Sequence, residues 1–248
     1  MITVAVSGAA GRMGQRTAAA VTAAEDLELV ALYDPSHAGQ TVEGIVVSSD
    51  AVVVGEGDVV VELTNPDVVM DNLREWRGLG VHAVVGTSGF DAGRLKAAQG
   101  MWGEGPPNCL IVPNFSIGAV LMMRFAEAAS AHFAGAEIIE LHHEDKPDAP
   151  SGTALATAAR MTSAVFESRE LVPGARGGAV GDVRVHSVRL PGKVAHQEVI
   201  FGNKGETLTI RHDTSDYESF MPGVLLAVRS IAGLAAFSVG LEGLLFKN

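Results

Sequence analysis

Short apolar runs alternate with longer segments of helical composition over the first part of the chain. Runs such as Val59-Val60-Val61 lack polar alternation, which is typical of strands buried on both faces of a parallel sheet. Strands that alternate with helices predict a doubly wound α/β domain. We expect strands over residues 2–6, 27–33, 58–63, 82–86 and 109–112, and helices over residues 11–24, 67–79 and 92–102.

The pattern changes after residue 114. A helix is predicted over 117–133, a strand over 136–141 and a second helix over 151–170. Three period-2 stretches follow without intervening helices, over 183–189, 194–201 and 206–211, and predict antiparallel neighbours in an α+β domain with an open sheet. The glycine-rich segment 171–181 is expected as a loop. A last helix over 223–234 could join either domain.

Composition excludes several classes of protein. With 47% hydrophobic and 19% charged residues in 248, the chain is expected to fold around a sizeable core. A net charge of −11 argues against generic nucleic-acid binding. The one cysteine, Cys109, cannot form an internal disulfide. We also expect no secretory signal, because the chain starts on a strand, and no membrane span, because prolines interrupt the longest uncharged stretch, so the protein is predicted to be cytoplasmic.

A glycine-rich turn joins the first strand to the first helix, with the sequence Gly8-Ala9-Ala10-Gly11-Arg12-Met13-Gly14. Gly8 would permit the sharp turn, Gly11 would let backbone amides approach a pyrophosphate, and Gly14 would allow close packing of helix on sheet. The spacing is one residue longer than the commonest dinucleotide fingerprint. An ordinary tight turn between strand and helix is the alternative.

An acid at the end of the second strand supports the dinucleotide interpretation. Asp34 lies 20 residues after Gly14, where a carboxylate that binds the adenosine ribose is expected. A carboxylate there repels the additional phosphate of NADP, and residues 35–37 supply no permanent cation to offset it. Because Arg12 could reach a phosphate, we predict that NADH is preferred and NADPH tolerated.

The densest polar segment runs from Glu140 to Ala154, between a predicted strand and a predicted helix. Ser151 is suited to cap that helix, whose first amides near Gly152 and Thr153 could bind a carboxylate or phosphate. Lys146 adds a local positive charge for an anionic substrate. His142 and His143 would project to opposite faces if the strand continues, and a histidine can donate a proton near neutral pH.

Two other interpretations of this segment stay open at this point. The histidines, the lysine and the cap could be ordinary surface and core residues. A metal site formed by His142, His143, Glu144 and Asp145 is disfavoured, because neighbouring side chains rarely converge on one ion. We therefore predict no metal.

Besides the glycine turn, the chain contains five distinctive runs: Gly86-Thr-Ser-Gly-Phe90, Val112-Pro-Asn-Phe-Ser-Ile-Gly118, Glu140-Leu-His-His-Glu-Asp-Lys146, Asp148-Ala-Pro-Ser-Gly-Thr-Ala154 and Val194-Ala-His-Gln-Glu-Val-Ile-Phe-Gly202. Together these motifs resemble the 4-hydroxy-tetrahydrodipicolinate reductase (dihydrodipicolinate reductase) family of the diaminopimelate and lysine pathway, particularly its actinobacterial members. Two positions depart from the family pattern: Ser88 stands where threonine is common, and Tyr217 where many members have arginine.

The resemblance implies hydride transfer from the nicotinamide to a cyclic unsaturated dicarboxylate, with His142 and Lys146 as proton donors. It implies that His143 and the helix start at Ser151, Gly152 and Thr153 bind the substrate. It also implies cofactor contacts from Gly8, Ala9, Ala10, Gly11, Arg12, Met13, Asp34, Gly86, Thr87, Ser88, Val112, Pro113, Asn114 and Phe115.

The fold expected from the resemblance is a Rossmann-type parallel-sheet domain, residues 1–115 and 216–248, and an open mixed-sheet α+β domain, residues 116–215. The second domain would bind substrate and mediate a homotetramer. Two other functions stay open: another Rossmann dehydrogenase that acts on a small amino or keto acid, and a non-catalytic NAD-binding sensor. The histidine and lysine motif argues against both.

Overall fold

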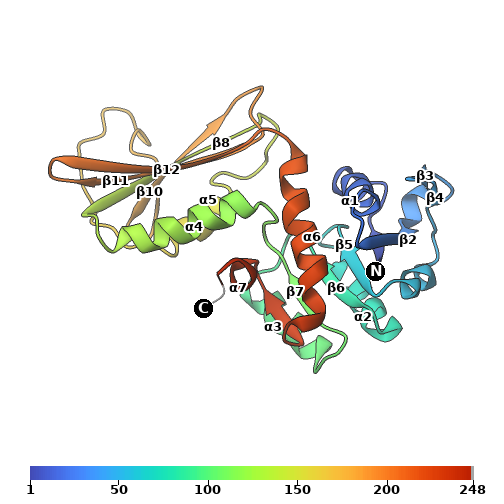
Figure 1. The fold of residues 1–248 in the computed structure, drawn as a ribbon. Coiled ribbons are helices and arrows are strands. Elements are labelled where there is room, and N and C mark those ends of the chain that lie inside the picture. The colour runs from blue at the N-terminus through green and yellow to red at the C-terminus, as the bar shows by residue number, and fades with distance from the viewer. Residues whose placement is uncertain (247–248) are drawn as a thin grey trace. The chain divides into compact units, whose positions relative to one another are not determined.

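The structure is a computed structural model that describes residues 1–246. The chain forms two compact units (Figure 1). Unit 1 consists of residues 1–116 together with the segment that begins at Phe220, and unit 2 is Ile117–Ser219. Among the described residues, no helix combines the length and apolar character needed to cross a lipid bilayer.

Unit 1 is built on a six-stranded sheet in which all neighbouring strands are parallel. From β1 the chain moves to β2 on one side and later to β5, β6 and β7 on the other, so the order reverses at β1. Ligands of such sheets bind beyond the carboxyl ends of the strands at this reversal. Across the sheet the strands are β13 (Phe237–Val239), β7 (Cys109–Ile111), β6 (His82–Val85), β5 (Val59–Glu62), β1 (Ile2–Ser7) and β2 (Leu27–Tyr33).

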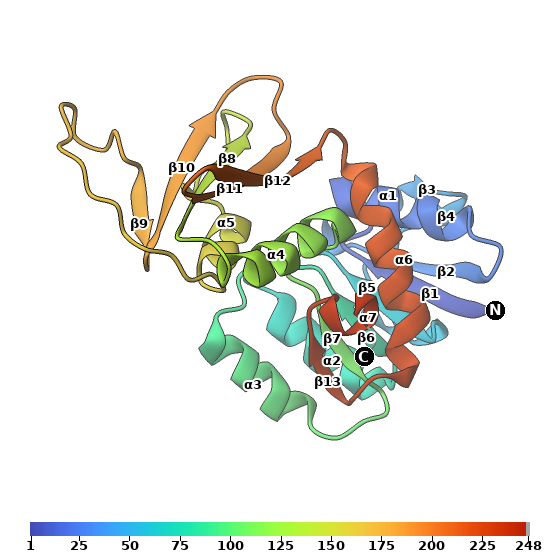
Figure 2. The ribbon, with the colours of Figure 1, turned by 60° about the vertical axis from the view of Figure 1, so that its left-hand side comes forward.

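Helices cover both faces of this sheet (Figure 2). Along β1, Ala5 packs into a core with the tryptophans Trp76 and Trp102, while Val6 packs with Ala18 in a separate core. This division explains the continuous apolar runs, because both faces of each strand are buried. The helices are α1 (Arg12–Thr22), α2 (Val69–Leu79), α3 (Ala92–Trp102), α6 (Met221–Ser230) and α7 (Glu242–Leu245). Unit 1 also contains the short helices η1 (Pro35–His37), η2 (Ala51–Glu56) and η4 (Ile231–Gly233) and a hairpin of β3 (Thr41–Val42) and β4 (Ile45–Val46), while the short helix η3 (Tyr217–Phe220) lies where unit 2 ends and unit 1 resumes.

The segment after Phe220 completes unit 1. Strand β13, which the sequence did not predict, pairs with β7 at the edge of the sheet. The Asn108 side chain donates hydrogen bonds to the carbonyls of Ile231 and Leu234, both at 3.0 Å. The last helix therefore belongs to the same unit as the first strands.

Unit 2 is a mixed five-stranded sheet with helices on one face. Its central strand β8 lies between β10, to which it is parallel, and β11, to which it is antiparallel. The expectation that residues 183–189 and 194–201 are antiparallel neighbours is therefore wrong, whereas the expected antiparallel pairing of 194–201 with 206–211 is confirmed by β11 and β12. The strands across the sheet are β12 (Glu206–Thr214), β11 (Ala195–Asn203), β8 (Gly135–His142), β10 (Val183–Arg189) and β9 (Gly178–Val180), and the helices are α4 (Ile117–Ser130) and α5 (Gly152–Ala158).

Two local predictions for unit 2 are wrong. The helix expected over 151–170 ends at Ala158, and the chain continues as an irregular trace toward β9 (Figure 2). It leaves the helix because its backbone and side chains bond the start of β8: Ala164 N–H donates to the Ala134 carbonyl at 2.9 Å, and Ser163 Oγ accepts from Ala136 N–H at 2.9 Å. The expected loop 171–181 contains β9, which pairs with β10.

Candidate active site

The glycine-rich turn lies at the carboxyl end of β1 and enters α1 with Gly11 as its N-cap. Gly8 has a φ of 78°, and a Cβ there would lie 2.7 Å from the Leu63 carbonyl oxygen at the end of β5. A Cβ on Gly14 would overlap the Gly8 carbonyl. Both glycines are therefore required by the close approach of turn, strand and helix, as the sequence predicted.

The amides of the turn are mostly used inside the protein. Gly8 and Ala9 donate to the Tyr33 carbonyl at 2.9 and 3.3 Å, and Gly11 donates to the Gly8 carbonyl at 3.1 Å. The first-turn amides of a helix have no acceptor within the helix and lie at the positive end of its dipole. The turn thus directs the N-terminus of α1 toward the carboxyl edge of the sheet, where an anionic group is favoured.

Asp34 follows β2 and is largely buried. Its carboxylate accepts hydrogen bonds from the amides of Ala10 at 3.3 Å and Ser36 at 3.2 Å, and His37 Nδ1 lies 3.0 Å away. These contacts link the glycine turn to the end of the neighbouring strand and orient the carboxylate. The glycine cradle, the helix N-terminus and the fixed carboxylate fit a dinucleotide.

A buried carboxylate, Glu62, lies at the end of β5, and no motif in the sequence predicts it. Glu62 is fully buried and accepts from Trp76 Nε1 at 2.8 Å and Asn72 Nδ2 at 3.3 Å, as well as from the Thr64 hydroxyl. Thr87 Oγ1 lies 3.4 Å from the Glu62 carbonyl. Neutral donors therefore satisfy this carboxylate and tie together the loops that follow β5 and β6.

The segments expected beside the nicotinamide follow β6 and β7 at the same edge. Val112 N–H donates to the Val85 carbonyl at 2.7 Å, and a Cβ on Gly86 would overlap the Phe115 ring. The Asn114 side chain accepts from Ser116 N–H at 2.8 Å. Unit 1 thus brings the predicted cofactor residues of four strand ends to one edge of its sheet.

Of the two proton donors expected in unit 2, His142 is the last residue of β8 and Lys146 lies in the loop that follows. Glu140 and His142 lie on the same face of the strand, and His142 Nδ1 contacts the Glu140 carboxylate. Arg189 at the end of β10 donates to both oxygens of that carboxylate, at 3.0 and 2.9 Å. Burial opposes ionisation of Glu140, but the hydrogen bonds from His142 and Arg189 outweigh it and lower its pKa to about 2.

The loop after β8 carries His143 and Lys146. Because β8 ends at His142, His143 lies beyond the strand, and the two histidines do not alternate across its faces. Lys146 Nζ donates to the Asp148 carboxylate at 2.6 Å, and this contact lowers the pKa of Asp148. The lysine side chain is mostly buried, with 20% of its surface exposed.

Ser151 caps α5 as predicted: its hydroxyl accepts from Ala154 N–H at 3.2 Å. Gly152 follows with ordinary helical geometry, and a Cβ there would meet no atom within 4 Å. The protein's own packing therefore does not require glycine at this position. Within residues 1–246, no group of three or more histidine, cysteine or acidic side chains could hold a metal ion.

Sequence profiles of a known protein family match both units. The sequence profile described as "Dihydrodipicolinate reductase, N-terminus" matches residues 2–115, and that described as "Dihydrodipicolinate reductase, C-terminus" matches residues 118–245. The chain belongs to the dihydrodipicolinate reductase family. The 4-hydroxy-tetrahydrodipicolinate reductases of Nocardia farcinica and Thermobifida fusca are each 52% identical to it, over 97% and 99% of both chains respectively.

A solved structure of this family has the same fold. It is a dipicolinate-bound dihydrodipicolinate reductase from Paenisporosarcina sp. TG-14, with 36% identity, a TM-score of 0.86 and 98% of each chain covered. The family and the fold class expected from the sequence are thereby confirmed. Glu62 and Arg189, in contrast, carry no motif signal, because only the folded sheet brings them beside the residues they contact.

Proposed function

We propose that this chain reduces 4-hydroxy-tetrahydrodipicolinate to tetrahydrodipicolinate with NAD(P)H, a step of diaminopimelate and lysine biosynthesis. The observation that carries this proposal is the 52% identity to reductases of that name over almost the whole length of both chains. The histidine and lysine motif is retained in this chain, at His142 and Lys146.

Unit 1 would hold the nicotinamide cofactor. When bound, the reduced cofactor supplies the hydride. The residues that would hold it are Gly8, Ala9, Ala10, Gly11, Arg12, Met13, Asp34, Gly86, Thr87, Ser88, Val112, Pro113, Asn114 and Phe115. The helix N-terminus would favour the pyrophosphate, and the buried Glu62 keeps the loop with Thr87 in place.

NADH is proposed as the preferred cofactor and NADPH as a tolerated one. With the adenosine ribose bound beside it, the carboxylate of Asp34 would repel the additional phosphate of NADPH. His37, at 3.0 Å from that carboxylate, offers a partner that charges only on protonation. The ratio of kcat/KM for the two cofactors tests this preference, and a strong preference for NADPH would contradict it.

Unit 2 would hold the dicarboxylate through His143, Ser151, Gly152 and Thr153. Two features support this assignment: the relative of known structure binds dipicolinate, a planar dicarboxylate, and Gly152 leaves open space beside its backbone. A proton would come from His142 or Lys146. Because the cofactor supplies the hydride, the protein's own contribution to catalysis would be to position the substrate and to provide the charged groups that bind it.

The decisive experiment follows NADH absorbance while the substrate is generated in place from pyruvate and aspartate semialdehyde by the upstream synthase. We expect NADH oxidation that depends on the synthase, on both of its substrates and on this protein. Cofactor binding without oxidation would contradict the proposal and favour a sensor.

A homotetramer in the cytoplasm is proposed as the working form. Unit 2 exposes large apolar side chains, including Phe166 with 60%, Leu171 with 83% and Val172 with 67% of its surface accessible. Exposed apolar patches are typical of surfaces that bind another protein. Light scattering coupled to size-exclusion chromatography measures the mass directly, and a monomer at micromolar concentration would contradict this assembly.

A further inference from the structure

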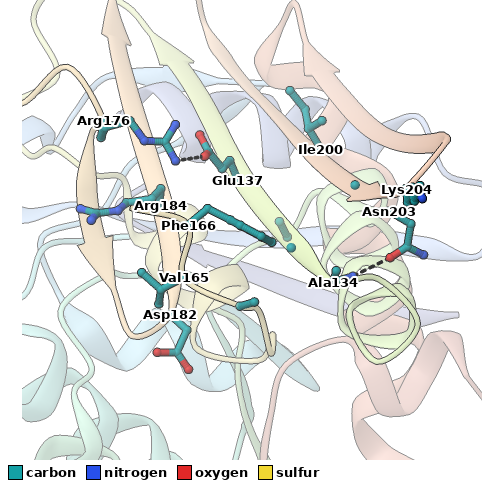
Figure 3. A pocket seen from close by; sticks show the side chains of 14 residues that line it. Ala134, Glu137, Val165, Phe166, Arg176, Asp182, Arg184, Ile200, Asn203 and Lys204 are labelled. Carbon is teal, nitrogen blue, oxygen red and sulfur yellow. Dashed lines mark hydrogen bonds and ion pairs between the residues drawn. The ribbon is translucent and has the colours of Figure 1, made fainter. Parts of the chain in front are cut away.

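Strand β8 carries two carboxylates, each held by an arginine and a histidine, on its opposite faces. On one face Glu140 contacts Arg189 and His142. On the other face Glu137 contacts Arg176 and, at 2.8 Å, His186 (Figure 3 shows Glu137 with Arg176). Only the first set contains a proposed proton donor, so the two sets can be compared within one strand.

The Glu140 set is the more enclosed of the two. The Glu140 side chain has no exposed surface, whereas 34% of the Glu137 side chain is exposed. Arg189 donates from two different nitrogens to the two oxygens of Glu140, which fixes the plane of the carboxylate. His142 approaches the oxygen Oε2 with Nδ1.

An ionised carboxylate has no proton to donate, so the hydrogen between Glu140 and His142 belongs to Nδ1. The neutral ring then carries its single proton on Nδ1 and leaves Nε2 as the basic nitrogen. A second proton, on Nε2, makes the ring cationic. Release of the Nε2 proton returns the ring to its neutral Nδ1–H form, with the electron pair kept by Nε2.

Arg189 also reaches the loop that carries the lysine. Its Nη2 donates to the Asp148 carbonyl at 2.7 Å, and the Asp148 carboxylate accepts from Lys146 Nζ at 2.6 Å. One guanidinium therefore connects the end of the strand that bears His142 to the loop that bears Lys146. A lysine at position 189 could contact either partner but has no planar pair of donors for both.

We propose that Glu140 and Arg189 are positioning residues for proton delivery: they hold His142 as the Nδ1–H form, direct Nε2 toward the substrate, and fix the loop of Lys146. This inference rests on the proposed function, in which His142 or Lys146 supplies the proton.

The test uses Glu140→Gln, with Glu137→Gln as the matched control on the opposite face. A glutamine offers one acceptor oxygen where Arg189 and His142 together use two, so the hydrogen bond that orients the His142 imidazole is weakened. We expect Glu140→Gln to lower kcat about 10–100-fold, because a positioned acid or base contributes roughly that much or more. The substrate KM should change less than about threefold, and Glu137→Gln should leave both constants within about twofold.

A second measurement needs no turnover. Nitrogen-15 NMR of the ligand-free protein distinguishes protonated from unprotonated ring nitrogens, and the His142 signals are assigned by their loss in His142→Gln. We expect the neutral His142 ring to carry its proton on Nδ1 in the unsubstituted protein and in Glu137→Gln. In Glu140→Gln we expect a mixture of both tautomers.

Arg189→Lys gives an independent check, because it keeps the charge and removes the paired donors. It should lower kcat less than Glu140→Gln does, and should leave the Nδ1 proton in place. Unchanged kcat in Glu140→Gln, or a neutral His142 ring protonated on Nε2 in the unsubstituted protein, would overturn the proposal. If the unsubstituted protein oxidises no NADH, the proposed function fails, yet the spectra still decide whether Glu140 sets the tautomer.

Discussion

Replacement of Gly152 by alanine separates binding from folding at the proposed substrate site. Gly152 is the first residue of α5, its backbone avoids the left-handed region, and an added Cβ meets nothing within 4 Å. The fold should therefore accept the methyl group. Alanine is favoured over glycine by up to about 1 kcal/mol within a helix, so we expect a melting temperature between unchanged and about 4 °C higher.

Substrate binding should respond in the opposite direction. A methyl group beside the backbone that is proposed to contact a carboxylate keeps that carboxylate away, and one misplaced methylene costs about 1–3 kcal/mol. We expect the substrate KM to rise about 10-fold to 100-fold, equivalent to about 1.4–2.8 kcal/mol, while kcat changes less.

The assay is NADH oxidation over a range of synthase-generated substrate, together with a thermal melt of the same preparation. Gly100→Ala serves as the control, because Gly100 lies within α3 of unit 1 and its Cβ would also meet nothing within 4 Å. An unchanged KM in a stable Gly152→Ala protein would refute the placement of the substrate at Gly152. A lower melting temperature of Gly152→Ala would show that the folded protein does not accommodate the added methyl group.

Three further outcomes are expected. His142→Gln should lower kcat more than it raises KM, whereas Lys146→Met should damage both, and steady-state kinetics with unchanged kcat in both variants would remove these residues from the chemistry. The pKa of Glu140 is lowered from 4.5 to about 2. The stability it contributes is therefore present above pH 4.5 and is lost as the pH falls toward 2, at most about 1.4 kcal/mol per pH unit. Urea unfolding at pH 5 and pH 3 should show a larger loss of unfolding free energy for the unsubstituted protein than for Glu140→Gln, and equal losses would contradict the lowered pKa of Glu140. Gly14→Ala should destabilise unit 1 by about 1–3 kcal/mol, because the new Cβ overlaps the Gly8 carbonyl, and an unchanged melting temperature would show that the turn adjusts.

Much of unit 1 could be predicted from the sequence because its signals are local. A strand buried on both faces needs an apolar run, as at Val59-Val60-Val61, and the sharp turn at Gly8 needs a residue without Cβ. Ser151 could likewise be predicted as a cap from its place before a helical segment. These features depend on a few consecutive residues.

The features that could not be predicted from the sequence depend on contacts between residues that are distant along the chain. The helix after Ser151 stops early because residues 163 and 164 bond the start of β8, which outweighs their helical composition. Strand β9 exists because β10 lies beside it, and its three residues are too few to show a period. Arg189 stands 49 positions from Glu140, so its role follows only from the parallel pairing of β10 with β8.

The order in which the chain emerges during synthesis matters for unit 1. Strand β7 ends at Ile111, yet its edge partner β13 begins at Phe237, after all of unit 2 has been made. Until then one edge of β7 has no strand beside it, and the Asn108 side chain lacks the carbonyls of Ile231 and Leu234. An uncovered strand edge is a site of misassociation, so a nascent chain that is halted after β7 and before Phe237 would expose this edge to pairing with another chain.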